Sequence, residues 1–179
     1  MTIFLSGGAK NGKSTLAQHL TRALAKGGPM YYVATMIPHD AEDNARIARH
    51  LQEREGWGFS TLECGKDITK SIIDKNINGS FLFDSVTALL ANEMFPGPEP
   101  DLTASQRVKA DLLALADHAE NVVFVSDFIY SDAAHYDDLT QAYRKGLADA
   151  DRALAARCDC VAELCGGNIT VHKGVLPQW

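Results

Sequence analysis

The sequence lacks the features that mark membrane, secreted and nucleic-acid-binding proteins. Its 179 residues contain no apolar run approaching the roughly 18 residues that mark a membrane-spanning helix. The first apolar run begins at residue 2, so no signal peptide is expected. The net charge of −6 argues against a general nucleic-acid-binding surface, which needs a basic face. We therefore expect a cytoplasmic protein with no membrane span and no nucleic-acid partner.

Cysteine is also scarce, and its spacing fits neither a disulfide framework nor a zinc finger. The four cysteines are Cys64, Cys158, Cys160 and Cys165, and no Cys-x-x-Cys pair exists among them. His172 lies near the last three and could complete a metal site, but reduced thiols in the core are the better interpretation. With 46% hydrophobic residues, the chain can bury a core without disulfides or a structural metal. We expect a single domain over residues 1–179.

What the sequence does contain is a complete phosphate-binding pattern near its N-terminus. The pattern G-x-x-x-x-G-K-[ST] is matched at every fixed position by Gly7, Gly8, Ala9, Lys10, Asn11, Gly12, Lys13 and Ser14. An apolar, β-prone run precedes it at residues 2–6, and apolar residues at helical spacing follow it as far as Gly27-Gly28-Pro29. An ordinary glycine turn before a helix is the alternative. The full motif between a strand and a helix instead predicts a nucleoside triphosphate site.

Each part of this pattern has a physical role in binding phosphate. The glycines let backbone N–H groups converge on phosphate oxygens, and the helix N-terminus adds partial positive charge. Lys13 is expected to reach the β- and γ-phosphates from an exposed loop, and the Ser14 hydroxyl is expected to bind Mg²⁺. Thr15, the next residue, is counted with the nucleotide-binding set.

Beyond this motif the chain alternates predicted strands and helices. Strands are expected at residues 30–35, 59–64, 80–84 and 121–126, and helices at residues 40–55, 67–75, 86–95, 103–120 and 139–157. Residues 161–172 indicate a hairpin turned by Gly166-Gly167. Strands joined by helical crossovers imply an α/β fold, in which helices cover both faces of a mainly parallel sheet and a C-terminal β-hairpin follows.

Asp84 is the second chemical landmark, because it ends the predicted strand that contains Phe81, Leu82 and Phe83. The carboxyl ends of strands in such sheets gather around the ligand. A carboxylate there suits an Mg²⁺ ion that Ser14 and phosphate oxygens also bind. Asp84 could instead cap the helix that follows it. We favour the metal role.

The third landmark is a basic stripe on the helix predicted at residues 40–55. Arg46, His50 and Arg54 are spaced four residues apart and share one face, with Arg49 beside them. Neighbouring guanidinium groups disfavour a protonated imidazole, so His50 is expected to be neutral and nucleophilic. Such a histidine could attack an α-phosphate and expel pyrophosphate while the arginines bind phosphates. From the pattern alone, a solvated charged helix is the simpler interpretation.

Several further segments match one known family in the same order. They are Tyr32-Val33-Ala34-Thr35, Arg46-Ile47-Ala48-Arg49-His50 with Arg54 and Trp57, Thr61 with Glu63, Leu82-Phe83-Asp84-Ser85-Val86-Thr87 with Asn92, and Val123-Phe124-Val125-Ser126. With the phosphate-binding pattern, they resemble the bifunctional adenosylcobinamide kinase/adenosylcobinamide-phosphate guanylyltransferase family of cobalamin synthesis. The resemblance covers nearly the whole chain, from Thr2 to about Gly174.

This resemblance implies a RecA-like P-loop fold and two reactions. The terminal hydroxyl of the aminopropanol arm of adenosylcobinamide is phosphorylated from ATP or GTP. GMP then passes from GTP to a histidine, and from the histidine to that phosphate, which yields adenosylcobinamide-GDP. The resemblance implies that His50 is the histidine that carries GMP. It also implies a homo-oligomer, by similarity to proteins that assemble as trimers.

Taken together, the motifs and the resemblance define the expected site. The catalytic residues are His50 and Lys13, and Mg²⁺ is held by Ser14 and Asp84. Nucleotide, as GTP or ATP, is bound by residues 7–15, Val33, Ala34, Thr35, Arg46, Arg54, Glu63 and Asp84.

The sequence departs from the family's pattern after the strand predicted at residues 121–126. Where the family usually reads Asn-Glu-Val-Gly, this chain has Asp127-Phe128-Ile129-Tyr130, and the family's asparagine on the last long helix is replaced around Asp151. Loops at the carboxyl ends of strands line ligand crevices, so Tyr130 and His135 are expected to face the phosphate acceptor. A P-loop kinase for another small alcohol and a nucleotide-binding relative without the second activity remain alternatives.

Overall fold

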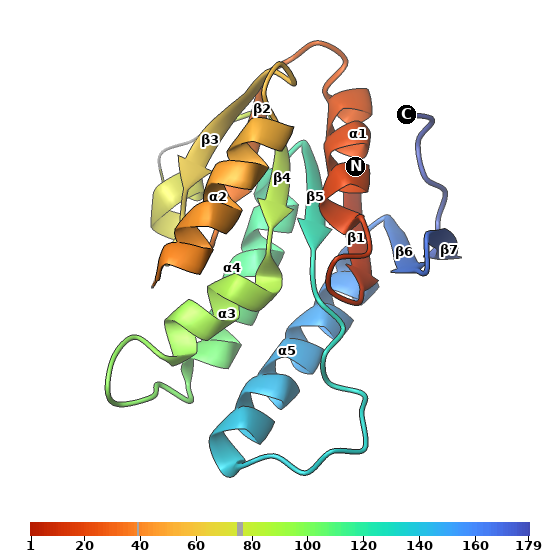
Figure 1. Ribbon diagram of the computed structural model, residues 1–179. Coiled ribbons are helices and arrows are strands. Elements are labelled where there is room, and N and C mark those ends of the chain that lie inside the picture. The colour runs from red at the N-terminus through yellow and green to blue at the C-terminus, as the bar shows by residue number, and fades with distance from the viewer. Residues whose placement is uncertain (39, 75–76) are drawn as a thin grey trace.

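The computed structural model describes residues 1–38, 40–74 and 77–179, apart from some side chains of helix α2. Within these residues, seven strands form one sheet that carries helices on both faces (Figure 1). The strands are β1 (Thr2–Gly7), β2 (Met30–Ala34), β3 (Phe59–Glu63), β4 (Ser80–Asp84), β5 (Asn121–Val125), β6 (Cys160–Cys165) and β7 (Asn168–Lys173). The helices are α1 (Lys13–Ala25), α2 (Ala41–Glu53), α3 (Val86–Met94), α4 (Ala104–His118) and α5 (Asp138–Arg157), with a π-helical turn η1 (Thr69–Ile73).

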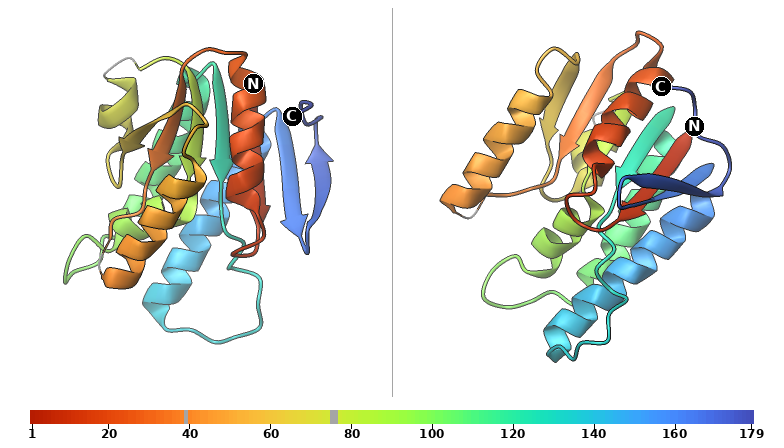
Figure 2. Two further views of the ribbon diagram at one scale, coloured as in Figure 1. Left: turned by 45° about the horizontal axis from the view of Figure 1, so that its top comes forward. Right: turned by 45° about the vertical axis from the view of Figure 1, so that its right-hand side comes forward.

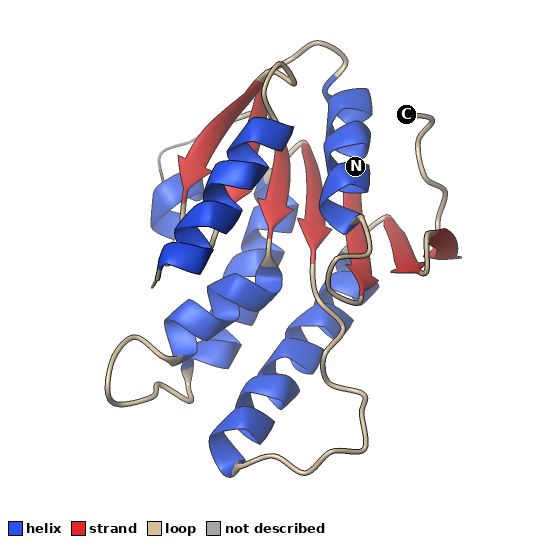
Figure 3. Cartoon of the chain, in the orientation of Figure 1, coloured by secondary structure: helices blue, strands red, loops and turns tan. Residues whose placement is uncertain are grey.

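The order of the strands brings the sequence landmarks to one edge of the sheet. The strands lie in the order β3-β2-β4-β5-β1-β6-β7, and every neighbouring pair is parallel except β6 with β7. Across the sheet, Glu63 is in register with Ala34, Ala34 with Asp84, and Asp84 with Val125. The carboxyl ends of β1, β2, β4 and β5 therefore share one edge, which is the lower edge in Figure 3.

Alternation along the strands divides the core between the two faces. In β1, Ile3 and Leu5 pack against Leu16 and Leu20 of α1, whereas Phe4 belongs to the cluster on the other face. That second cluster includes buried residues of α3, α4 and α5. Figures 1 and 2 show α1 and α2 on one side of the sheet and α3, α4 and α5 on the other.

The predicted α/β class, parallel sheet and C-terminal hairpin are confirmed. Most predicted elements begin and end within two residues of the observed ones, and β4 matches its prediction at both ends. The hairpin turns at Gly166 and Gly167, whose φ angles of 55° and 79° are those that a tight hairpin turn demands.

The helix predicted at residues 67–75 is shorter in the structure and π-helical. Within the described residues it is η1 (Thr69–Ile73), and the apolar residues Ile68 and Ile72 are buried as expected. Asp67 has a φ of 50°, which no right-handed helix accommodates, so a helix cannot begin at that residue.

The cysteines and helices show two further features. Cys64, Cys158 and Cys160 are buried, Cys165 is exposed, and none of the four forms a disulfide. None of the described helices is long and apolar enough to span a membrane.

Candidate functional site

The glycine-rich loop joins β1 to α1 at the carboxyl edge of the sheet and is braced against β6. A Cβ added to Gly7 would collide with the carbonyl oxygen of Leu164, so only glycine fits there. Asn11 Nδ2 donates a hydrogen bond to that same carbonyl at 3.2 Å. Lys10 and Gly12 have φ angles of 59° and 84°, so the loop turns sharply before the helix.

The helix that follows the loop begins with open N–H groups. Among the described residues, no side chain caps the N-terminus of α1, where Gly12 is the N-cap. The first N–H groups of a helix have no partner within it and attract anions. Ala9, Lys10 and Thr15 are exposed around this end, and Ser14 is half-buried.

Lys13 is buried at the start of α1, with 4% of its surface exposed. Its Nζ donates hydrogen bonds to the carbonyl oxygen of Gly8 at 2.6 Å and to Oδ1 of Asp127 at 2.8 Å. The expectation of an exposed loop lysine was therefore wrong. The side chain lies beneath the loop because Asp127, which follows β5, supplies the opposite charge.

Asp84 lies at the end of β4 and contacts the neighbouring strand. Its Oδ2 accepts a 2.8 Å hydrogen bond from the hydroxyl of Tyr32 in β2. The guanidinium carbon of Arg54 lies 3.4 Å from the centroid of the Tyr32 ring, and Arg54 as a whole is 8% exposed. Asp84 does not cap the next helix, because Ser85 does so by accepting a hydrogen bond from the N–H of Ala88 at 3.2 Å.

Thr35 ties the end of β2 to the segment that follows β4. Its Oγ1 donates to the carbonyl oxygen of Ser85 at 2.9 Å and accepts from the N–H of Ser85 at 2.6 Å. Asn92 Nδ2 donates to the carbonyl oxygen of Thr35 at 2.7 Å. Val33 is buried and Ala34 half-buried beside it. These contacts fix the carboxyl ends of β2 and β4 relative to each other.

The basic stripe is only partly described. The backbone of Arg46 and His50 belongs to α2, but their side chains lie outside the described residues. Arg49 is exposed. Arg54 lies just beyond α2 rather than on it, since the helix ends at Glu53 and not at residue 55. Its side chain packs onto the sheet through Tyr32.

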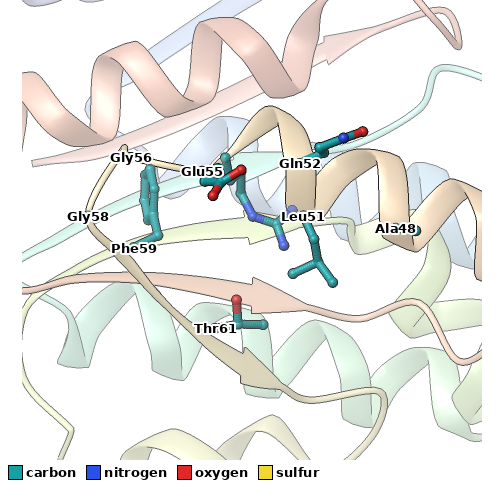
Figure 4. A pocket seen from close by; sticks show the side chains of 9 residues that line it. Ala48, Leu51, Gln52, Glu55, Gly56, Gly58, Phe59 and Thr61 are labelled. Atoms are coloured by element: carbon teal, nitrogen blue, oxygen red, sulfur yellow. The ribbon is translucent and has the colours of Figure 1, made fainter.

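A pocket of about 890 Å³ lies between the end of α2 and the edge strand β3 (Figure 4). Its lining consists of Ala48, Leu51, Gln52, Arg54, Glu55, Gly56, Gly58, Phe59 and Thr61. Figure 4 shows Leu51 and Thr61 facing it from opposite sides. Trp57, in the same turn, packs edge-on against His19 of α1 with 4.8 Å between ring centroids. The turn is thus docked between α1 and the sheet.

The segment after β5 contains a buried acid that the sequence analysis did not place in the site. Asp151 of α5 is 2% exposed, and its Oδ2 accepts hydrogen bonds from Ser126 Oγ at 3.0 Å and from the Tyr130 hydroxyl at 3.1 Å. Its Oδ1 has no partner among the described residues. Burial raises the pKa of Asp151 to about 7. Tyr130 therefore points toward α5, whereas His135 is exposed.

Comparison with solved structures supports the fold. The KaiC-like protein PH0186 from Pyrococcus horikoshii OT3 is similar over 99% of this chain and 81% of its own, with 15% identity and a TM-score of 0.50. The flagellar accessory protein FlaH from Methanocaldococcus jannaschii aligns over 97% and 78%, with 14% identity and a TM-score of 0.44. The first similarity and the strand arrangement confirm the RecA-like P-loop fold. No curated protein sequence shows a significant match.

The family model described as cobinamide kinase/cobinamide phosphate guanyltransferase matches residues 3–171. The chain belongs to this family. The resemblance seen in the sequence is thereby confirmed, and the protein is a nucleotide-dependent transferase of cobalamin biosynthesis. The matched span of the cobinamide kinase/guanyltransferase family includes the glycine-rich loop, α2 and Asp84.

Within the framework of this family, the structure brings together most of the predicted nucleotide-binding residues. The glycine-rich loop, Thr35 and Asp84 share the carboxyl edge of the sheet, and Arg54 reaches Asp84 through Tyr32. Glu63 is exposed at the same edge, at the end of β3. The side chains of Arg46 and His50 are the members that the structure does not describe.

Two residues that contact this set were missed by the sequence analysis. Asp127 could have been found from the sequence, because it comes shortly after an apolar strand, much as Asp84 comes at the end of one. Tyr32 lies in a segment that matches the family, but its contact with Asp84 was not expected, since a tyrosine within an apolar strand usually indicates packing alone.

Proposed function

We propose that this protein carries out two successive transfers on one corrinoid. It phosphorylates the terminal hydroxyl of adenosylcobinamide from ATP or GTP. It then transfers GMP from GTP, through a histidine, to the new phosphate and forms adenosylcobinamide-GDP. The observation that carries the proposal is the open N-terminus of α1 beneath a complete glycine-rich loop, at the same edge as Asp84, in a member of this family.

The triphosphate is assigned to the glycine-rich loop. The uncapped N–H groups of α1 and the loop backbone would donate to phosphate oxygens. Lys13 would exchange its contacts with Gly8 and Asp127 for contacts with the β- and γ-phosphates. A triphosphate carries more negative charge than one carboxylate and can therefore compete with it for the ammonium group. This residue would then stabilise the charge that develops as the γ-phosphoryl group is transferred.

Mg²⁺ is assigned to Ser14 and Asp84. These residues supply a hydroxyl and a carboxylate, and hard divalent cations prefer such oxygen ligands. Asp84 is half-buried and its Oδ2 is already oriented by Tyr32, so the carboxylate is held in one position rather than free in solvent. Bound there with the phosphates, the ion would neutralise negative charge on the triphosphate.

The guanylyl transfer is assigned to α2. An imidazole nitrogen of His50 attacks the α-phosphorus of GTP, the bond from that phosphorus to the β-phosphate oxygen breaks, and pyrophosphate leaves. Arg46 and Arg54 would stabilise charge on the phosphates. The pocket beside Arg54 lies at the end of the helix that carries His50.

The oligomeric state is a separate part of the proposal. We propose a homo-oligomer, by the family resemblance.

The reaction products test the proposed function. The protein is incubated with adenosylcobinamide and, in separate reactions, ATP alone, GTP alone, or neither, and the corrinoid products are identified by mass. We expect cobinamide phosphate with ATP and cobinamide-GDP with GTP. Phosphorylation of a different small alcohol but not of adenosylcobinamide would favour a kinase of another specificity. Nucleotide binding without any corrinoid product would contradict the proposal.

A further inference from the structure

Asp127 forms an ion pair with Lys13, and neither of the two proposed transfers uses its carboxylate. It lies two residues after the end of β5, and its Oδ1 is 2.8 Å from Lys13 Nζ. About a quarter of its side chain is exposed, at 26%, compared with 5% for that of Lys13. The carboxylate therefore faces both the buried lysine and the solvent at the carboxyl edge of the sheet.

The backbone around Asp127 is fixed by two hydrogen bonds. The N–H of Asp127 donates to Thr87 Oγ1 at 2.8 Å, which ties it to the start of α3. The N–H of Phe128 donates to the carbonyl oxygen of Gly7 at 3.0 Å, which ties the next residue to the glycine-rich loop. β5 lies beside both β1 and β4. Asp127 is thus held between the phosphate-binding loop and the strand that carries Asp84.

Nucleotide binding changes the charges that surround the Asp127 carboxylate. When Lys13 turns to the β- and γ-phosphates, Asp127 loses its cation and stands beside a polyanion. Two negative groups at such short range repel each other unless a hydrogen atom lies between them. The phosphorylation reaction brings one suitable donor to that place, which is the hydroxyl group that receives the γ-phosphoryl group.

The geometry points to Asp127 as the general base of the phosphorylation step, an inference that rests on the proposed function. The acceptor hydroxyl donates its hydrogen bond to the Asp127 carboxylate. As its oxygen forms a bond to the γ-phosphorus, the proton passes to Asp127. The bond between the γ-phosphorus and the bridging oxygen breaks, and the electron pair leaves with the nucleoside diphosphate. Asp127 then returns the proton to solvent.

The other acid at this edge is less suited to the same role. Asp84 accepts the Tyr32 hydrogen bond and is assigned to Mg²⁺, so a proton on it would compete with the ion. The attack of a neutral imidazole on the α-phosphate requires no base at the γ-phosphate. Asp127 should therefore matter for phosphorylation and not for guanylylation.

The test separates these two half-reactions in Asp127→Asn, which keeps the size of the side chain but removes the base. Phosphorylation is followed by transfer of label from γ-³²P-labelled ATP to adenosylcobinamide, and guanylylation by retention of label from α-³²P-labelled GTP on denatured protein. The control is Asp117→Asn, the same change in an exposed acid of α4 that pairs with Arg157. We expect Asp127→Asn to lower the kcat of phosphorylation by roughly 10²- to 10⁴-fold. Labelling by GTP and nucleotide affinity should be at least those of the wild type.

Several results would overturn the assignment. A wild-type kcat for phosphorylation in Asp127→Asn would show that Asp127 only balances the charge of Lys13. Equal losses in both half-reactions would show that it organises the loop. If Asp127→Asn does not fold, Asp127→Glu must phosphorylate faster than Asp127→Ser, and equal rates would overturn the base role. A wild-type protein that phosphorylates no cobinamide would contradict the proposed function and this role together, before any substitution is made.

Discussion

The hydroxyl of Tyr32 donates a 2.8 Å hydrogen bond to Oδ2 of Asp84, and these residues belong to neighbouring strands. The guanidinium of Arg54 lies over the same tyrosine ring. A continuous set of contacts therefore runs from the end of the helix that carries His50 to the acid assigned to Mg²⁺. Tyr32 therefore links the segment proposed for guanylyl transfer to the acid proposed for Mg²⁺ binding.

Tyr32→Phe should weaken the response to Mg²⁺ without unfolding the protein. The substitution removes one hydrogen bond to a carboxylate and keeps the ring under Arg54. We expect turnover at low Mg²⁺ to fall about tenfold and high Mg²⁺ to restore most of it. One hydrogen bond to a carboxylate contributes about 1.4 kcal/mol, which corresponds to a factor of ten in Mg²⁺ affinity. The measurement is initial rate against Mg²⁺ concentration. Tyr31→Phe, the same change on the other face of β2, is the control, and matching curves for both variants would refute the positioning role.

Asp84→Asn should have the larger effect on the same assay. The amide keeps the size of the side chain but removes the charge that Mg²⁺ needs. Turnover should fall by orders of magnitude, and added Mg²⁺ should restore only part of it. Activity near that of the wild type would mean that Asp84 is not a metal ligand.

Lys13→Met should abolish tight nucleotide binding. Loss of a charge-assisted contact to phosphate is expected to weaken the nucleotide Kd by about 10- to 100-fold or more. Isothermal titration calorimetry measures this directly. Because Lys13 is buried, the variant also leaves the Asp127 carboxylate without its cation, which could lower stability. The double variant Lys13→Met with Asp127→Asn removes both charges, so a loss of nucleotide affinity that persists in it comes from the missing lysine and not from the unpaired acid.

The control for this prediction lies at the other end of the same helix. Lys26→Met removes an exposed lysine from the C-terminus of α1 and should bind nucleotide as the wild type does. Wild-type affinity in a folded Lys13→Met protein would rule out the assignment of the triphosphate to this loop.

Asp151 should make the protein less stable as pH rises through the acid range. Burial raises the pKa of Asp151 from its ordinary 3.8 to about 7, and the hydrogen bonds from Ser126 and Tyr130 offset this only in part. Between these values the folded state holds a proton that the unfolded state has released. The free energy of unfolding therefore falls between about pH 4 and pH 7, by up to about 4 kcal/mol from this group, and then levels off.

Asp151→Asn tests this linkage, and asparagine is the residue that the family resemblance has near this position. We expect the variant to be more stable than the wild type at pH 8 and to lose most of the decline between pH 4 and pH 7, as measured by urea unfolding. Asp149→Asn, two residues away in a pair with Arg152, should keep the decline. An unchanged slope in Asp151→Asn would show that the carboxylate is ionised in the folded protein throughout.

The sequence predicted this fold well wherever local patterns decide the structure. Ser80–Asp84 is an apolar run that ends in an acid, and it forms β4 with those bounds. The paired glycines Gly166 and Gly167 predicted the hairpin correctly, because both central positions of its turn have positive φ, which glycine adopts without strain. The helix expected from Asp67 begins two residues later, as η1, because apolar spacing does not reveal the left-handed backbone at Asp67.

The contacts within the site could not be predicted in the same way. Lys13 and Asp127 are 114 residues apart, and they meet only because β5 pairs with β1. The burial of Lys13 thus depends on strand order, which no local pattern specifies. Arg54 meets Tyr32 for a similar reason, since α2 ends before Arg54 and the chain turns it onto the sheet.

The covalent labelling of His50 tests the central claim most directly. The protein is incubated with α-³²P-labelled GTP and Mg²⁺, denatured, and treated with acid or alkali, since a phosphoramidate is labile in acid and durable in alkali. We expect the wild type and His172→Ala, a change on the exposed hairpin, to retain an acid-labile label and release pyrophosphate. His50→Ala should retain none and still transfer the γ-phosphate to adenosylcobinamide. An unlabelled wild type, or the same acid-labile adduct in His50→Ala, would contradict the account.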